Sequence, residues 1–482
     1  MCHVAYPPPF HAKVIALEAP GGEPREARLV APSVVGCGEP FALRLAVLDG
    51  DGYPSVDFAD AVALRGDFAA PREATVRFER GRPALARVEG VRVPSAGLWR
   101  FRAELGGQVF HSNPVCVCER PGRRIWWGDP HVHTILSNCH PGGARSLNFC
   151  YAAARYASGL DWVAAADHVS NGRCDFSKWR EQRQACDHHH EPPQFATLYA
   201  YEASLRGGCG GDNNPYFRVA PEMFADHYEE GDVASLCRQL AEAVGPENFF
   251  VVPHHTTRTG KHGEIPDAIY PGERFMPLVE IHSKWGTSEY RGNPNALKEV
   301  HPGPGYAVDL LGQGLRLGFI AGTDSHATMP SAGGIEPGHI DRPPGFTAVL
   351  APRLGRDALF DALRSRQAYA TSGERVYLDA VVAGTAMGQT ATWPQEDQPR
   401  RVAARAAARG EIAKLEVVRN GQAVHELRPG SWHAELAWSD ERPLARLWLE
   451  SPRLGRFAYY YVRVTCRSGA QAWSSPVWLV AP

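Results

Sequence analysis

The stretch Ile125-Trp126-Trp127-Gly128-Asp129-Pro130-His131-Val132-His133-Thr134 places two histidines directly after a short apolar run. We expect residues 125–129 to form a buried β-strand that ends at these histidines. Side chains two positions apart in extended backbone point to the same side, so the imidazoles of His131 and His133 can face one cavity. Neutral imidazole is a common ligand of divalent metals, and the stretch therefore predicts a metal site at the end of this strand.

Five further apolar runs in the middle of the chain are each followed closely by side chains that can bind a metal or transfer a proton. Residues 162–166 precede Asp167 and His168, residues 197–201 precede Glu202, residues 249–253 precede His254 and His255, residues 278–281 precede His282, and residues 318–322 precede Asp324 and His326. Longer amphipathic segments such as residues 233–244 separate several of these runs, which is typical of parallel strands joined by helices. The carboxyl ends of the strands of an α/β barrel meet at one rim, where active sites are built. We therefore expect an α/β barrel whose rim carries these side chains.

The pair Asp324 and His326 repeats the spacing of His131 and His133, so both of its side chains can face the same cavity. Carboxylates and imidazoles together can hold two ions ~3.5 to 4 Å apart with a bridging group between them. Glu202 is our candidate for the bridging carboxylate. Zn²⁺, Mn²⁺ and Fe²⁺ are the ions that suit these ligands.

Both flanks of the chain have a different pattern from its middle. From residue 27 to residue 118, and again after residue 373, short alternating runs are split by turn residues such as Asp49-Gly50-Asp51-Gly52 and Arg419-Asn420-Gly421. This pattern is typical of antiparallel β-sandwiches. We therefore expect three domains in the 482 residues: an N-terminal β-sandwich over residues 1–122, the barrel over residues 123–373, and a C-terminal β-sandwich over residues 374–482.

The charge balance argues against nucleic-acid and membrane partners. The chain has 51 basic and 53 acidic residues and a formal net charge of −2, so it has no field that would attract phosphate backbones or anionic lipid. No stretch approaches the ~20 apolar residues of a membrane span, and the first residues lack the apolar core of a secretory signal. We expect a cytoplasmic protein that acts on a small-molecule substrate and can form homo-oligomers. Its 11 cysteines have no regular spacing, so most are expected to be reduced.

Several of these segments form an ordered set of motifs. They are Trp127-Gly128-Asp129-Pro130-His131-Val132-His133-Thr134, Ala166-Asp167-His168, Tyr201-Glu202, Pro253-His254-His255 and Gly322-Thr323-Asp324-Ser325-His326. In this order they resemble the motifs of the PHP (polymerase and histidinol phosphatase) superfamily. Residues 317–373 are similar to a bacterial branch of that superfamily that includes carbaryl hydrolase-type enzymes. The resemblance implies a distorted (β/α)7 barrel, a site for two or three divalent metal ions, and hydrolysis of phosphoesters or carbamate-type esters.

The resemblance also implies how the ligands are shared among the ions. One ion would take His131, His133, Glu202 and Asp324, a second would take Glu202 and His254, and a third would take His168 and His326 with one further residue. That further residue is a histidine or aspartate in relatives, whereas this chain has Cys139 with His140 beside it, either of which can ligate. Asp212 is a second departure, because a histidine is expected there. A carboxylate at this position favours a harder metal or holds the second ion more weakly.

Two alternative roles are expected for each of several other residues near the strand ends. Asp129 is expected to orient a ligand imidazole, or alternatively to cap the strand end. His255 and His282 could protonate or hold the leaving group, or could be supporting or surface histidines. Arg258 and Lys284 could bind the substrate at the rim, or could be solvated loop residues.

These features together predict a metal-dependent hydrolase that uses a metal-activated water to cleave an ester-type bond in a small molecule. The bond would be a phosphoester, or a carbamate or carboxylic ester. The alternative is a catalytically degenerate barrel that acts as a metal-containing binding or scaffolding module, because Cys139 and Asp212 interrupt the usual ligand set.

Overall fold

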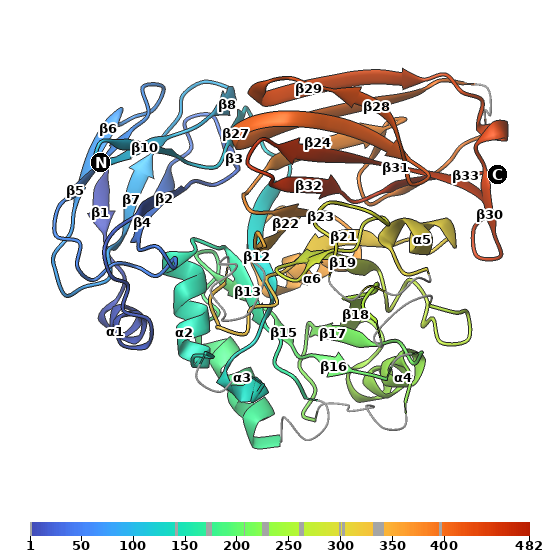
Figure 1. Ribbon diagram of the computed structural model, residues 1–482, viewed down its shortest axis with the longest axis horizontal. Helices are drawn as coiled ribbons and strands as arrows, with labels where there is room; N and C mark the ends of the chain where they lie inside the picture. The colour runs from blue at the N-terminus through green and yellow to red at the C-terminus, as the bar shows by residue number, and fades with distance from the viewer. Residues whose placement is uncertain are drawn as a thin grey trace.

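The chain is mixed α/β and rich in strands (Figure 1). The computed structural model describes residues 2–139, 143–169, 176–206, 208–223, 231–259, 265–297, 300, 304–330, 342–394 and 398–482.

The N-terminal part forms two four-stranded antiparallel sheets that share one apolar core. The first sheet has the order β1 (His3–Ala5), β7 (Leu85–Val91), β4 (Phe41–Leu48), β2 (Glu26–Val30), and the second has the order β10 (Gln108–His111), β9 (Arg102–Leu105), β5 (Ala61–Arg65), β6 (Glu73–Arg77). Alternate residues are buried, as in β5, where Val62 and Leu64 belong to the core. One face of each strand therefore packs inward, as in other antiparallel sheets. A small sheet of β3 (Val34–Gly36), β11 (Val115–Cys118) and β8 (Gly97–Trp99) and the helix α1 (Pro9–Glu18) complete this part.

The strands of the middle part are divided among three sheets. One sheet contains β14 (Ala196–Thr197), β13 (Trp162–Ala165), β12 (Arg124–Val132), β22 (Gly345–Ala351) and β23 (Ala368–Ser372). A second sheet contains β15 (Tyr199–Ala200), β17 (Asp212–Phe217), β16 (Ala203–Ser204) and β18 (Phe249–Pro253). The third sheet contains β20 (Gly286–Thr287), β19 (Leu278–Ser283) and β21 (Gly318–Ala321). Strands β12, β13 and β14 are parallel to one another, as are β19 and β21.

The distorted (β/α)7 barrel expected from the sequence is not evident among the described residues. Strand β12 runs antiparallel to β22, and β17 runs antiparallel to both β15 and β18. Residues 212–217 thus form a buried strand between two predicted ones, and this strand interrupts the expected alternation of strands and helices.

The C-terminal strands continue the sheet that contains β12. Strand β32 (Gln471–Ser474) pairs with β23, so the sheet crosses the boundary expected at residue 373. From there the sheet continues through β31 (Gly455–Cys466), β27 (Arg400–Arg419), β24 (Tyr377–Val382) and β25 (Thr385–Ala386). Five more strands branch from this order by pairing with its members or with each other: β26 (Thr390–Thr392), β28 (Gln422–Leu427), β29 (Ser431–Asp440), β30 (Leu449–Ser451) and β33 (Val477–Val480). Aromatic and β-branched residues dominate the buried part of β31, which favours the strand conformation.

The N-terminal and C-terminal parts touch each other, as they do at the top of Figure 1. Arg409 Nη1 lies 3.8 Å from Glu26 Oε1, and the guanidinium of Arg100 lies 4.3 Å from the ring centroid of Trp432. The parts of the chain therefore form one connected body.

The helices cover the middle part. They are α2 (Leu147–Ala152), which continues as a π-helical turn (Ala153–Ala157), α3 (Phe176–His188), α4 (Val233–Val244), α5 (Ala307–Gly312) and α6 (Arg356–Arg364). A short 3₁₀ turn lies at Ile135–Ser137, and another, at Leu444–Arg446, lies in the C-terminal part. Helix α4 shows why they form: Asp232 caps its first turn by accepting from Ser235 N, and Val233, Leu236 and Leu240 form its buried stripe.

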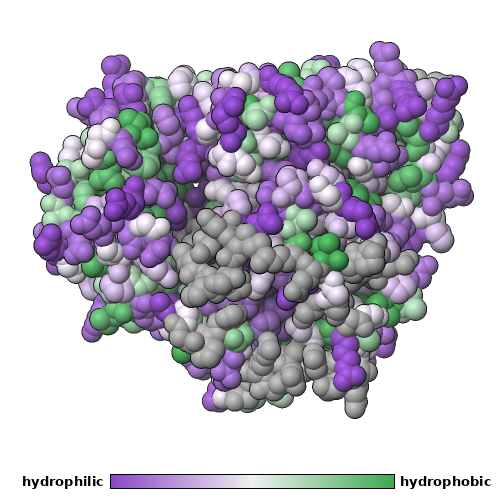
Figure 2. All heavy atoms as spheres, in the orientation of Figure 1, coloured by the Kyte–Doolittle hydropathy of each residue, from purple (hydrophilic) through white to green (hydrophobic). Residues whose placement is uncertain are grey.

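On the face shown in Figure 2, hydrophobic residues lie singly or in small groups among hydrophilic ones. Among the helices that the structure describes, none has the length and apolar character needed to cross a membrane.

Candidate metal centre

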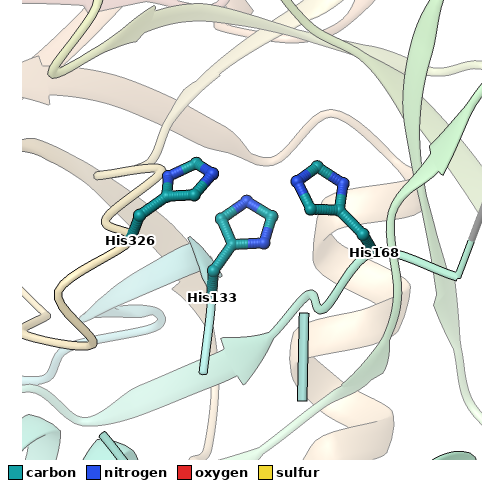
Figure 3. Close-up of side chains that lie close together, drawn as sticks. All are labelled: His133, His168 and His326. Carbon is teal, nitrogen blue, oxygen red and sulfur yellow. The ribbon is translucent and has the colours of Figure 1, made fainter. Parts of the chain in front are cut away.

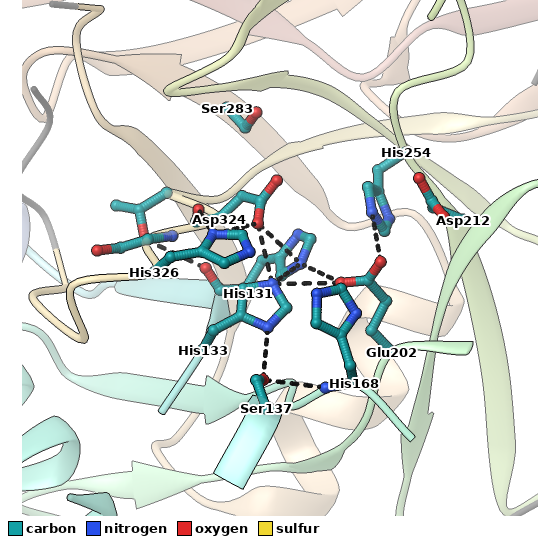
Figure 4. A network of polar contacts seen from close by, with 12 residues as sticks. His131, His133, Ser137, His168, Glu202, Asp212, His254, Ser283, Asp324 and His326 are labelled. Atoms are coloured by element: carbon teal, nitrogen blue, oxygen red, sulfur yellow. Dashed lines mark hydrogen bonds and ion pairs between the residues drawn. The ribbon is translucent and has the colours of Figure 1, made fainter. Parts of the chain in front are cut away.

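The ends of four strands bring the predicted ligands together (Figure 4). Bridge pairing joins Val132 to Ser325 and His168 to Glu202, so the segments that follow β12, β13, β15 and β21 lie side by side. His254 N also donates to the carbonyl of Asp212 at 3.1 Å. These strand ends therefore lie close together, although the strands belong to separate sheets.

The first cluster consists of His131, His133, Glu202 and Asp324. His133 Nε2 lies 3.0 Å from Asp324 Oδ1 and 3.2 Å from Glu202 Oε2, and His131 Nε2 lies 3.4 Å from the same Glu202 oxygen. All four side chains are buried. Two imidazoles and two carboxylates that meet at one point are a ligand set suited to Zn²⁺, Mn²⁺ or Fe²⁺.

A second cluster consists of His133, His168 and His326 (Figure 3). The ring of His133 lies between the other two, with centroid distances of 4.4 Å to His168 and 4.2 Å to His326. Cys139 belongs to none of the clusters found among the described residues, and His140 lies outside those residues. In this cluster, His133 is therefore the third ligand-type side chain beside His168 and His326, the role that was expected of Cys139 or His140.

Asp212, His254 and His255 form the third cluster. Asp212 begins β17, which pairs with the strand that ends just before His254. His255 has a left-handed backbone conformation, with φ 52°. Its Nε2 lies 3.1 Å from Asp324 Oδ2. Asp212, which departs from the family pattern, therefore lies among ligand-type side chains.

The carboxylates of Glu202 and Asp324 connect the clusters. Glu202 turns Oε2 toward His133 and His168, while its Oε1 lies 3.5 Å from His254 Nε2. Asp324 likewise turns Oδ1 toward His133 and Oδ2 toward His255. Each carboxylate thus offers one oxygen to the first cluster and the other to a third-cluster histidine, which is the geometry of a bridging ligand.

The buried carboxylates and imidazoles of these clusters stabilise one another's charged forms. Burial alone would raise the pKa of Glu202 and Asp324, but the surrounding imidazoles outweigh it and hold both well below their ordinary values. Burial disfavours charge on His133 and His255 as well, yet hydrogen bonds to carboxylates raise the pKa of each to about 9. A divalent cation can replace these protons as the neutralising charge.

The cluster also has donor atoms to spare for a metal. His254 is 1% exposed, and neither of its ring nitrogens has a hydrogen-bond partner among the described residues. Buried polar atoms are ordinarily hydrogen bonded. The residues present therefore fit a divalent ion.

Side chains around the clusters fix the orientation of the histidines. His131 Nδ1 lies 3.2 Å from Glu280 Oε2, and His133 Nδ1 lies 3.0 Å from Ser137 Oγ. Ser137 in turn donates to Asp167 at 2.6 Å. Contacts of this kind select the ring nitrogen that faces a metal.

The sequence analysis did not identify Glu280 or Ser137. Glu280 lies inside a predicted strand, two positions before His282. A carboxylate so close to a predicted site histidine was a signal that could have identified it. A register shift between these two residues in β19 separates them. Glu280 consequently contacts His131, whereas His282 contacts other groups.

The contacts of Asp129 and His282 favour the alternative role that was expected for each. Asp129 accepts from Thr323 N at 2.9 Å, from Thr323 Oγ1 at 2.6 Å and from His131 N at 3.1 Å, so it ties two ligand-bearing segments together through main chain and hydroxyl and does not orient an imidazole. Burial raises its pKa to about 7 against these bonds. The ring nitrogens of His282 lie 2.9 Å from Thr287 Oγ1 and 2.9 Å from the carbonyl of Pro343, and burial lowers its pKa to about 4.

Two cations lie beside the ring of Trp285. Lys284 Nζ lies 5.0 Å and Arg258 Cζ 5.6 Å from its ring centroid. The same ring meets His255 and His326 edge-on, at 6.0 and 5.9 Å. The residues predicted to bind the substrate therefore approach the same ring as two histidines of the clusters.

Comparisons with known proteins lead to uncharacterized relatives. Residues 335–420 match the model of a family described as "Protein of unknown function (DUF3604)". An uncharacterized protein of Chlamydia pneumoniae is 25% identical over 386 residues, which are 77% of this chain and 60% of that protein. One of Chlamydia muridarum is 34% identical over 215 residues, which are 42% of this chain and 34% of that protein. The chain thus spans less than two thirds of the length of either relative.

Among solved structures, the chain is similar to one from Bacteroides vulgatus, described as a two-domain protein containing a predicted PHP-like metal-dependent phosphoesterase. The TM-score is 0.39 and the identity 14%, with 72% of this chain and 91% of that chain covered. In sequence, the chain is therefore similar to uncharacterized proteins, and its chemistry must be judged from the residues of the metal centre.

Proposed function

We propose that this chain is a metal-dependent hydrolase of small-molecule esters, with two or three divalent ions held by the three clusters. The observation that supports it most directly is the division of the oxygens of Glu202 and Asp324 between the first cluster and the third-cluster histidines. Bound ions of this kind lower the pKa of a coordinated water toward ~7 and stabilise the negative charge that develops during hydrolysis.

The chain's own residues then position the ligands and the substrate. Glu280 and Ser137 hold the imidazoles of His131 and His133 in place. His255 is a ligand candidate as well as a proton donor, because it contacts both Asp324 and Asp212. Arg258 and Lys284 would receive the negatively charged part of the substrate beside Trp285.

The finer assignment belongs to the same proposal. The ordered motifs that supply the clusters support membership of the PHP superfamily, with residues 123–373 as its hydrolase domain and the flanking parts, 1–122 and 374–482, as β-sandwiches that pack against it. Zn²⁺, Mn²⁺ and Fe²⁺ remain the candidate ions, and phosphoesters and carbamate or carboxylic esters remain the candidate substrates.

Turnover of three chromogenic or fluorogenic esters tests the proposal. We expect the protein loaded with Mn²⁺ or Zn²⁺ to hydrolyse p-nitrophenyl phosphate, bis-p-nitrophenyl phosphate or 1-naphthyl carbamate, and a chelator to abolish the reaction. Glu202→Gln should lower kcat/KM by roughly 10³-fold, because several kcal/mol of charge stabilisation depend on the bridged ions. The matched variant Glu79→Gln, at an exposed position of the N-terminal part, should leave the rate unchanged.

The preferred substrate would assign the bond class. Metal binding without turnover of any of the three esters would instead favour the degenerate binding module. Equal activity of the Glu202→Gln and wild-type proteins would contradict the proposed site.

A further inference from the structure

Four arginines line an open cavity at the other end of strands β19 and β21 from the metal centre. The cavity has a volume of about 630 Å³, and Arg274, Arg316, Arg364 and Arg366 line it. Arg274 precedes β19 and Arg316 precedes β21, whereas Asp324 of the metal centre follows β21. Because β19 and β21 are parallel, the cavity and the metal centre lie at opposite ends of the same two strands.

Main-chain carbonyls hold two of these arginines. Arg364 donates to the carbonyls of Pro246 at 3.1 Å and Glu247 at 2.5 Å, and Arg366 Nε donates to the carbonyl of Gly388 at 3.1 Å. Gly388 has φ 81°, and a Cβ there would lie 2.0 Å from the carbonyl oxygen of Arg366, so this close approach requires glycine. Carbonyl oxygens position the guanidinium groups without cancelling their charge.

The charge of the cavity lining is unbalanced. Of the lining residues that the structure describes, only Glu273 carries a carboxylate, and it pairs with Arg316. Arg274 has one ion pair, in which its Nη2 lies 3.8 Å from Glu247 Oε2, and it makes no hydrogen bond to the described part of the chain. The Nη groups of Arg366 likewise have no hydrogen-bond partner among the described residues. Donor groups of at least two arginines are thus available.

Like charges in the cavity repel one another. Burial, and then the charges of Arg274 and Arg218, lower the pKa of Arg364, although Glu247 and Asp361 oppose them. Burial also lowers the pKa of Arg366, where the charge of Arg316 opposes the favourable effect of Glu273. An anion between these side chains would relieve the repulsion.

We propose that this cavity binds a small anion of the diphosphate class, with two or more negative charges, at a site separate from the metal centre. Planar guanidinium groups pair with phosphate oxygens through two hydrogen bonds at once. The cavity volume lies within the range of small-ligand sites, and a net charge of −2 gives the chain no general attraction for nucleic acid.

The anion would also connect two parts of the chain. Arg274, Arg316 and Arg366 come from the turns before β19, β21 and β23, whereas residues 388–390 of the lining lie at the start of the C-terminal part. Binding should therefore stabilise the contact between the middle and C-terminal parts.

Calorimetric titration of the metal-free 482-residue chain with pyrophosphate tests this site. We expect Arg274→Gln and Arg366→Gln each to weaken binding by about tenfold, because each removes charge-assisted hydrogen bonds. Arg428→Gln, which removes an exposed arginine on another surface, should leave the affinity unchanged. Glu202→Gln should also leave it unchanged, which separates this site from the metal centre and from the proposed hydrolase activity.

Arg274→Gln is the decisive variant, because the Arg274 side chain is 55% exposed and its loss should not impair folding. Without the anion its melting temperature should equal or exceed that of the wild type, since one repulsive charge is gone. Equal pyrophosphate affinity in the wild type and this variant would overturn the proposal. So would equally tight binding of inorganic monophosphate, or binding of an oligonucleotide but not of pyrophosphate.

Discussion

Two buried carboxylates of this chain, Glu289 and Glu202, are neutralised in different ways. Glu289 is 1% exposed and accepts from Tyr461 Oη at 2.6 Å, Arg463 Nη1 at 2.7 Å and Trp473 Nε1 at 2.7 Å. Glu202 is 3% exposed, and its ion-pair partners among the described residues are imidazoles. The first group joins the C-terminal sheet to the segment after β20, and the second lies at the converging strand ends.

The two groups differ in whether the partner of the carboxylate can lose its proton. A guanidinium keeps its proton at every pH at which proteins fold, so the positive charge that Arg463 places beside Glu289 is permanent. An imidazole can lose its proton near neutral pH, and a metal ion can then take its place beside the carboxylate. Burial and charge are thus shared by both groups, but only the partners of Glu202 make it a candidate metal centre.

Removing each carboxylate from the metal-free protein should separate the two groups most clearly. Glu289→Gln removes one of the two carboxylates beside Arg463, whose Nε still pairs with Glu416 Oε2 at 2.8 Å, and it weakens the bonds from Tyr461 and Trp473. We expect it to lower the free energy of unfolding by about 3 kcal/mol. Glu202→Gln should cost less, because the neighbouring imidazoles can release protons. Urea unfolding of both variants measures this, and a larger loss for Glu202→Gln would contradict the distinction.

The pH dependence of the metal-free protein should show the titratable partners directly. Carboxylates raise the pKa of His133 and His255 to about 9 from an ordinary value of 6.5, so the stabilisation is complete below pH 6.5 and is lost as the pH rises through 9. The loss is on the order of 3 kcal/mol for each histidine at most.

Chemical denaturation between pH 6 and 9.5, with and without Mn²⁺ or Zn²⁺, measures this effect. The bound metal should remove most of the decline, because it replaces the protons. A metal-free protein whose stability rises over this range would contradict the assignment of the charges.

The smallest effect should come from the carboxylate behind His131. Glu280→Gln keeps the size of the side chain but weakens its contact with His131 Nδ1, and we expect metal affinity to fall by about 10–100-fold. Competition with a chromogenic chelator gives the affinity. Glu426→Gln, at a partly exposed position of strand β28, is the matched control, and equal losses in both variants would show that Glu280 does not support the ligand.

The side chains of the three clusters follow from local features of the sequence more readily than the sheets that carry them do. The two-residue spacing of His131 and His133 and the runs before Glu202, His254 and Asp324 are local features of the sequence. The pairing of β17 with β18 depends on hydrogen bonds between segments far apart in the chain. No local pattern specifies such pairing, so the expected barrel was not an accurate description.

The supporting contacts were harder to predict for a related reason. Glu280 and His282 have the spacing that places side chains on one face, but the register shift between them in β19 separates their directions. Asp129 was expected to orient an imidazole or to cap the strand end. It accepts from Thr323 N and His131 N, which lie nearly two hundred positions apart in the chain. The continuity of the sheet from β23 to β32 is likewise a long-range pairing that composition cannot reveal.

Metal content by inductively coupled plasma mass spectrometry is the measurement that tests the central claim most directly. After incubation with Mn²⁺ or Zn²⁺ and removal of the excess, we expect two or more divalent ions per wild-type chain, fewer in Glu202→Gln, and the wild-type number in folded Glu289→Gln. Less than one ion per wild-type chain, or equal loss in both variants, would contradict the claim that imidazole-paired carboxylates form the metal centre.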